Sequence, residues 1–204
     1  MAGLRIAREL YRAGSAAGVA VAIAPALPDL GRVVSEVPIP VLAQHVDPVE
    51  PGARTGFVPA EALAASGARG SLVNHSEHPL STDATGEAIR RLGALGLVAV
   101  VCARDERRAK QLAAFEPPYL AVEPPELIGG RRAVSTARPE LVANTVRAVR
   151  SVSRSTRVLC GAGVHSRVDV ARALELGSEG ILVASAVTRA REPRRAIEDL
   201  LSGF

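Results

Sequence analysis

Short apolar runs alternate with longer amphipathic stretches along the whole chain, and this alternation constrains the fold more than any other feature. Such a pattern is typical of βα units that feed a parallel sheet. Seven runs predict strands, at residues 19–24, 41–44, 71–74, 97–102, 119–123, 157–161 and 180–184. Eight stretches predict helices, at 4–13, 28–36, 59–66, 83–95, 105–115, 138–151, 167–176 and 192–202. The chain is therefore predicted to be an α/β protein.

The absence of a glycine-rich phosphate loop separates the two common ways of building a parallel sheet. A doubly wound sheet usually carries a GxGxxG motif after its first strand, and none follows residues 19–24. A TIM-type (β/α)8 barrel is favoured, although a complete barrel has eight strands and about 250 residues. We expect one barrel domain over residues 1–204 with seven strands and eight helices, apparently missing its first strand.

Charge and composition exclude other classes of protein. Lys110 is the only lysine among 25 basic residues, and the arginines are spread along the chain rather than gathered in one stripe. Because aromatic residues make up only 2% of the chain, we expect no nucleic-acid partner. No run approaches the roughly 18 apolar residues of a membrane span, and no apolar signal core follows Met1. A cytoplasmic protein without a membrane partner is predicted.

Cysteine and histidine spacing gives no sign of a metal site. Cys102 and Cys160 lie far apart in apolar runs, which indicates buried free thiols. His45, His78 and His165 have no partners at metal-ligand spacing and are expected to be structural or exposed. We therefore expect neither a metal nor a cofactor.

Polar and small residues gather where the predicted strands end, and a barrel builds its active site at these positions. One strand end runs into Asn74-His75-Ser76-Glu77, and another ends in Glu123 before Pro124 and Pro125. An imidazole and a carboxylate thus face the same end of the barrel. The last two strands are followed by Gly161-Ala162-Gly163 and by Ala184-Ser185-Ala186, whose backbone amides are predicted to hold a phosphate group.

These motifs, together with residues 43–48 (AQHVDP), resemble those of the triosephosphate isomerase family, and most of all its short archaeal form. The resemblance implies an aldose–ketose isomerase of glycolysis and gluconeogenesis that interconverts dihydroxyacetone phosphate and D-glyceraldehyde 3-phosphate through an enediolate. It implies that Glu123 is the catalytic base and that His75 polarises the substrate oxygens. It also implies a set of residues that bind the substrate and its phosphate: Ile128, Gly130, Gly163, Ala184 and Ser185.

The resemblance further implies a closing lid and an oligomer. Pro124 and Pro125 restrict the backbone after the carboxylate, and the following glycines restore its freedom, as a hinged lid requires. Gly129-Gly130-Arg131 stands where the family has Gly-Thr-Gly, and His165-Ser166-Arg167 where it has Ser-Thr-Gly. Arg54-Thr55-Gly56 corresponds to the loop that reaches a neighbouring subunit, so a homodimer or homotetramer is implied.

One part of the family's machinery is not found in the sequence. Members carry an Asn-x-Lys motif at the end of the first strand, whereas Lys110 lies in a predicted polar helix. Because a preorganised charge of this kind stabilises a transition state by several kcal/mol, we expect weak activity from the chain as written. Three hypotheses remain: an isomerase whose first strand is encoded upstream of Met1, a non-catalytic phosphate-ligand-binding or scaffold protein, and another phosphosugar isomerase or lyase.

Overall fold

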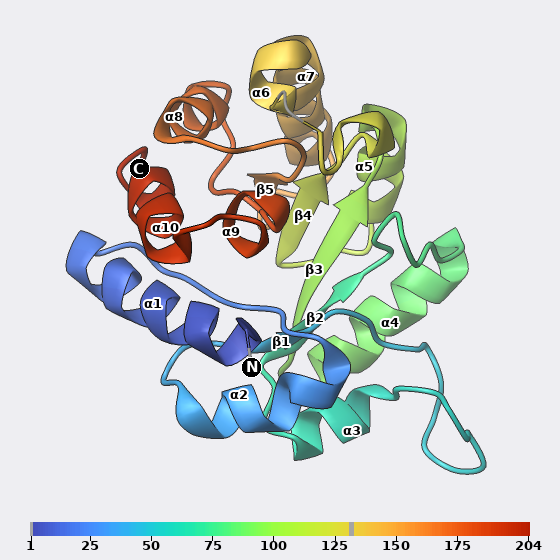
Figure 1. The fold of residues 1–204 in the computed structure, drawn as a ribbon. Coiled ribbons are helices and arrows are strands. Elements are labelled where there is room, and N and C mark those ends of the chain that lie inside the picture. Colours follow the sequence, from blue (N-terminus) through green and yellow to red (C-terminus); the bar gives the residue numbers. More distant parts are fainter. Residues whose placement is uncertain (1, 131–132) are drawn as a thin grey trace.

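The strands form one parallel sheet in the computed structural model, which describes residues 2–130 and 133–204 (Figure 1). Five strands pair in chain order: β1 (Leu42–Ala43), β2 (Gly70–Val73), β3 (Val98–Ala103), β4 (Tyr119–Val122) and β5 (Arg157–Cys160). One further parallel pairing extends each end of this sheet, between Ile23 and Val41 and between Cys160 and Ile181. All seven predicted strand runs therefore take part in the sheet, the first and last by a single pairing each.

All eight predicted helices are present in the described residues. They are α1 (Ala2–Ala17), α2 (Leu30–Glu36), α3 (Ala60–Ala65), α4 (Thr82–Ala94), α5 (Glu106–Ala113), α7 (Pro139–Arg150), α8 (Arg167–Glu175) and α10 (Pro193–Leu201). The sequence did not predict two four-residue helices, α6 (Val134–Ala137) and α9 (Ser185–Thr188), or the 3-10 turns η1 (Leu27–Asp29) and η2 (Pro125–Leu127). A single turn is too short to show a helical period.

Local sequence explains where the longer elements begin and end. Pro139 occupies the first turn of α7, where its missing N–H has no intrahelical partner to lose. Gly67, which follows α3, and Gly96, which follows α4, have φ angles of 80° and 68°, which glycine adopts without strain. The strands that follow are buried on both faces, so β3 is a continuous apolar run rather than an alternating one.

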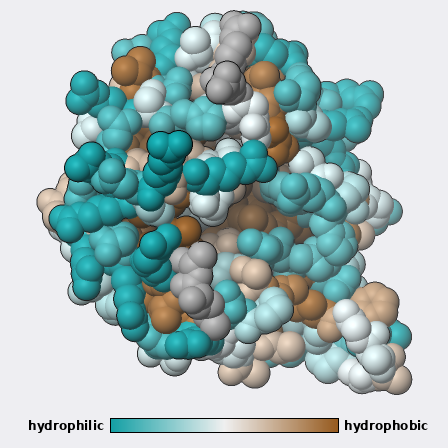
Figure 2. All heavy atoms as spheres, viewed as in Figure 1, coloured by the Kyte–Doolittle hydropathy of each residue, from teal (hydrophilic) through white to brown (hydrophobic). Residues whose placement is uncertain are grey.

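The sheet is open between its first and last strands. In the described part of the chain, no strand lies between the segment at Ile23 and the segment at Ile181. Ala20 and Ala22, beside this opening, are exposed, and Figure 2 shows apolar atoms recessed in a central hollow within a hydrophilic outer layer. α1 packs against α10, so the helices meet around the opening (Figure 1). The fold is thus a TIM-type α/β arrangement with seven parallel strand segments, as the sequence predicted.

The outer helices are amphipathic rather than apolar. Over residues 2–130 and 133–204, no helix is long and hydrophobic enough to cross a bilayer.

Candidate active site

The carboxyl ends of neighbouring strands bring His75 and Glu123 together. β2, β3 and β4 are paired in parallel, and the arrowheads of β3 and β4 point toward the end of the molecule that carries α6 (Figure 1). His75 follows β2 by two residues, and Glu123 directly follows β4. The His75 Nε2 atom lies 3.8 Å from Glu123 Oε2. The imidazole and the carboxylate that were predicted from strand ends therefore form one site.

A turn after β2 sets the hydrogen-bonding state of His75. The backbone N–H of Glu77 donates to His75 Nδ1 at 3.3 Å. Because a ring nitrogen that accepts a hydrogen bond carries no hydrogen, the neutral ring that satisfies this bond has its hydrogen on Nε2. That atom is the one that faces Glu123, so His75 presents an N–H donor to anything bound between the two side chains.

Asn74 fixes the loop that presents His75, a role that sequence reasoning did not assign to it. Its φ angle is 60°, in the left-handed region that asparagine tolerates better than most residues. Its Nδ2 donates to the carbonyl oxygen of Cys102 at 2.8 Å, and its Oδ1 accepts from the N–H of Leu80 at 2.9 Å. The only signal for this role in the sequence is an asparagine directly after a buried strand.

Burial makes Glu123 a stronger base than an ordinary carboxylate. The residue is 4% exposed, and its Oε2 atom has no hydrogen-bond partner among the described residues. Burial raises the pKa of Glu123 above its ordinary value, against smaller opposing effects of the Cys102 thiol and of His75. A carboxylate with a raised pKa accepts a proton more readily once it is ionised.

Cys102 and Gly161 determine where the Glu123 side chain lies. Burial holds the pKa of the Cys102 thiol well above its ordinary value, so the thiol stays protonated and can donate to the carboxylate. A Cβ atom at Gly161 would lie 2.4 Å from Glu123 Cγ, closer than any real contact. Sequence reasoning treated Cys102 only as a buried thiol and Gly161 only as an amide donor, because neither contact is visible without the strand pairing.

Six backbone amides were expected to hold a phosphate, and the structure corrects this prediction at one of them, Gly161. In the described residues, the N–H groups of Gly163, Ala184 and Ser185 have no hydrogen-bond acceptor. Ser185 begins α9, and the first amides of a helix have no intrahelical partner. Gly161 was also expected to offer its amide to phosphate, but its N–H donates to Val122 O at 3.1 Å because it continues the pairing of β5 with β4.

The lid after Glu123 is folded on itself. The Ile128 N–H donates to Pro125 O at 3.2 Å, and the Gly130 N–H donates to Leu127 O at 3.1 Å. The backbone amides of the two lid residues that were predicted to bind substrate are therefore engaged within the lid. Arg131, one of the two residues by which the lid departs from the family's Gly-Thr-Gly, lies outside the described residues.

The other residues that the sequence singled out form no part of the His75–Glu123 pair. Lys110 is an exposed residue of α5, as expected. Arg54 and Thr55 lie in an exposed loop that extends from the body between β1 and α3 (Figure 1). The buried His45 ring stacks on His78 with centroids 3.6 Å apart. The residues that the structure describes contain no group of three potential metal ligands.

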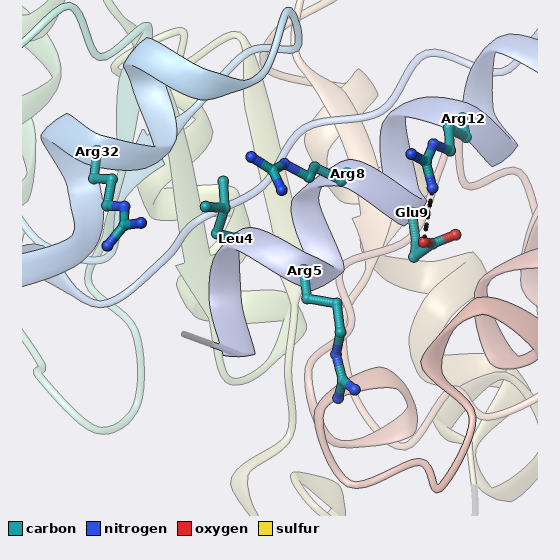
Figure 3. A pocket seen from close by; sticks show the side chains of 6 residues that line it. All are labelled: Leu4, Arg5, Arg8, Glu9, Arg12 and Arg32. Carbon is teal, nitrogen blue, oxygen red and sulfur yellow. Dashed lines mark hydrogen bonds and ion pairs between the residues drawn. The ribbon is translucent and has the colours of Figure 1, made fainter.

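A hollow of about 340 Å³ between α1 and α2 is not a second candidate (Figure 3). Its lining is rich in arginine: Leu4, Arg5, Arg8, Glu9, Arg12 and Arg32. Arg8 and Arg32 both pair with Glu36, and Arg12 pairs with Glu9. Arg5 points away from Arg8 and Arg32, so the guanidinium groups do not converge on one point.

Comparison with known proteins agrees with this geometry. The family model described as triosephosphate isomerase matches residues 4–200. The triosephosphate isomerase of Methanocaldococcus jannaschii is 43% identical over 199 residues, covering 98% of this chain and 91% of its own. That of Methanothermus fervidus is 42% identical over 199 residues, covering 98% and 90%. That of Cenarchaeum symbiosum is 47% identical over 190 residues, covering 92% and 85%.

Proposed function

This chain belongs to the triosephosphate isomerase family, and on that premise we propose that Glu123 is its catalytic base and His75 its electrophile. The chain is an isomerase that interconverts dihydroxyacetone phosphate and D-glyceraldehyde 3-phosphate. The observation that carries the residue assignment is the approach of His75 Nε2 to Glu123 Oε2, 3.8 Å apart at adjoining strand ends.

The two side chains divide the chemistry between them. Glu123 removes a proton from the carbon next to the substrate carbonyl, and the electron pair of that C–H bond forms the enediolate. The Nε2–H of His75 donates to the oxygen on which negative charge develops. His75 passes its Nε2 proton to that oxygen and takes the proton of the neighbouring hydroxyl group, and Glu123 returns the carbon-bound proton to the neighbouring carbon, which completes the exchange of aldehyde and ketone. Burial of the carboxylate supports this assignment because it raises the pKa of Glu123 toward the working pH.

The free amides of Gly163, Ala184 and Ser185 are proposed to hold the substrate phosphate. Backbone N–H groups without an acceptor favour a bound anion, and the small residues here allow a close approach. Ile128 and Gly130 join these contacts once the hydrogen bonds within the lid have opened. In this arrangement the lid excludes water from the enediolate.

A rate assay on the full chain tests this proposal. The wild type is expected to convert D-glyceraldehyde 3-phosphate slowly, since its only lysine lies in α5, and Glu123→Gln is expected to abolish the conversion. Equal rates for the two proteins would refute the role of Glu123. The missing lysine favours a second candidate, a non-catalytic phosphate-ligand-binding protein, and tight binding of 2-phosphoglycolate without any conversion would support it.

We further infer a homo-oligomer in the cytoplasm. The exposed loop with Arg54 and Thr55 extends beyond the body of the protein, which supports contact with a second copy. Cys102 and Cys160 are buried free thiols, which fits a reducing compartment. Light scattering that finds a homodimer or homotetramer would support the assembly, and a monomer at all concentrations would refute it.

A further inference from the structure

The turn that carries His75 rests on a neighbouring loop through a pair of stacked histidine rings. The ring centroids of His45 and His78 are 3.6 Å apart, and the two rings are within 11° of parallel. His45 follows β1 by two residues, and the turn with His75 and His78 follows β2. Because β1 and β2 pair in parallel, the stack joins two loops at the same end of the sheet. The chemistry described so far uses only His75 of these three histidines.

His45 is a fixed support for this stack. The residue is 8% exposed, and its Nε2 atom lies 3.2 Å from Asp47 Oδ1. Because a carboxylate oxygen only accepts hydrogen bonds, Nε2 is the donor. Asp47 is itself held on both sides, since its Oδ2 accepts from the Val58 N–H at 2.7 Å and its N–H donates to Val58 O at 2.8 Å. The His45 ring therefore keeps one orientation beneath His78.

His78 carries this support into the turn. Its N–H donates to the carbonyl oxygen of His75 at 2.8 Å, so the backbone of the two residues moves together. His78 is exposed, whereas the ring beneath it is buried. The stack thus ties a surface turn to the interior of the protein.

The position of the turn decides which way the His75 ring presents its hydrogen. The Glu77 N–H donates to His75 Nδ1 at 3.3 Å, which leaves the ring hydrogen on Nε2, 3.8 Å from Glu123 Oε2. At 3.3 Å this bond is long, so a small shift of the turn weakens it. A contact that holds the turn in place therefore also holds the Nε2–H of His75 in its direction.

We propose that His78 is a positioning residue for His75: its ring, stacked on His45, holds the turn that directs the His75 Nε2–H toward the substrate oxygens. The effect on turnover rests on the proposed function, whereas the restraint on the turn does not. A stacked aromatic pair changes an equilibrium by about twofold to tenfold. Loss of the His78 ring should therefore loosen the turn by about that factor.

Hydrogen exchange in the unliganded full-length chain tests the restraint. In His78→Ala the amides of Glu77 and Leu80, which donate within the turn, are expected to exchange about twofold to tenfold faster than in the wild type. His78→Phe keeps a ring and is expected to stay near the wild type. Tyr11→Ala is the matched control, because it removes another exposed aromatic ring, from α1, and should leave both amides unchanged.

A second background tests whether the two rings act as a pair. His45→Leu keeps the buried space filled but has no ring to stack on. In this background His78→Ala should cause no further increase in the exchange of the Leu80 amide. A further increase as large as that in the wild-type background would overturn the proposal.

Steady-state kinetics, with calorimetry of 2-phosphoglycolate binding, test the consequence for the reaction. His78→Ala is expected to lower kcat by about twofold to tenfold while KM and Kd change by less than about twofold, and His78→Phe is expected to restore kcat. The affinity is spared because the proposed phosphate amides, at Gly163, Ala184 and Ser185, lie in other loops.

Unchanged exchange in His78→Ala overturns the proposal, as does faster exchange with an unchanged kcat. The proposal also fails if His78→Phe behaves like His78→Ala. A chain that does not isomerise trioses would refute the proposed function, whereas the exchange rates would still decide whether His78 holds the turn.

Discussion

Replacing Gly161 with alanine should displace the Glu123 carboxylate. A Cβ atom at this position would lie 2.4 Å from Glu123 Cγ, 2.9 Å from Cδ and 3.0 Å from Oε1. Ordinary contact begins at 3.4 Å, so the Glu123 side chain has to move by about 1 Å. A misplacement of about 1 Å typically lowers kcat by about 10²-fold. We therefore expect a loss of about 10²-fold in kcat, with an overpacking cost of about 1–3 kcal/mol in stability.

A steady-state assay of triose phosphate conversion, with thermal unfolding of the same samples, tests this prediction. Gly180→Ala is the matched control, because its Cβ meets only the flexible tip of Leu159, at 3.0 Å. That variant is expected to keep kcat within about threefold of the wild type. A folded Gly161→Ala protein with wild-type kcat would refute the idea that Gly161 sets the position of Glu123.

Three further predictions concern stability and assembly. Burial raises the pKa of folded Glu123, so ionisation of the buried carboxylate disfavours folding. Glu123→Gln should therefore raise the free energy of unfolding at pH 7, and this gain should vanish in urea titrations as the pH falls below the ordinary pKa of a glutamate. The Arg91 side chain is 11% exposed and pairs with Glu50, Glu61 and Glu87. Arg91→Met should lower the free energy of unfolding by about 2–3 kcal/mol, whereas Arg90→Met, at an exposed pair with Glu87, should lower it by about 0.5 kcal/mol. Equal losses for the two variants in urea unfolding would contradict this prediction. The open sheet between Ile23 and Ile181 should promote concentration-dependent association beyond a tetramer, and light scattering that shows one monodisperse species would count against it.

The arrangement of elements could be predicted from the sequence because it depends on local patterns. Apolar runs such as 97–102 and amphipathic stretches such as 138–151 mark strands and helices whose order alone gives a parallel sheet. The outermost strands form only single pairings in the structure, at Ile23 and Ile181. A strand needs a neighbour on each side to complete its ladder, and the pattern of one segment cannot show whether that neighbour is present.

The site was predictable in its polar residues but not in its supporting contacts. His75 and Glu123 follow recognisable strands, so their placement at one end of the sheet follows from topology. The supporting contacts depend on pairing between segments that are distant in the sequence. They are the thiol of Cys102 beside Glu123, the space left by Gly161, and the hydrogen bond from His165 to Gly130. The same pairing removed the Gly161 amide from the predicted phosphate cradle, because a backbone N–H within a ladder already has its acceptor.

Deuterium incorporation from D2O into dihydroxyacetone phosphate is the most direct test of Glu123 as the base. The reacting carbon should gain deuterium in the presence of the full chain, even if net conversion is slow, because each proton removal lets solvent hydrogen return. The rate with the wild type should exceed that with Glu123→Gln by at least about 10²-fold. Equal incorporation by the two proteins, or none above the rate without protein, would contradict the assignment of Glu123 and His75 to this reaction.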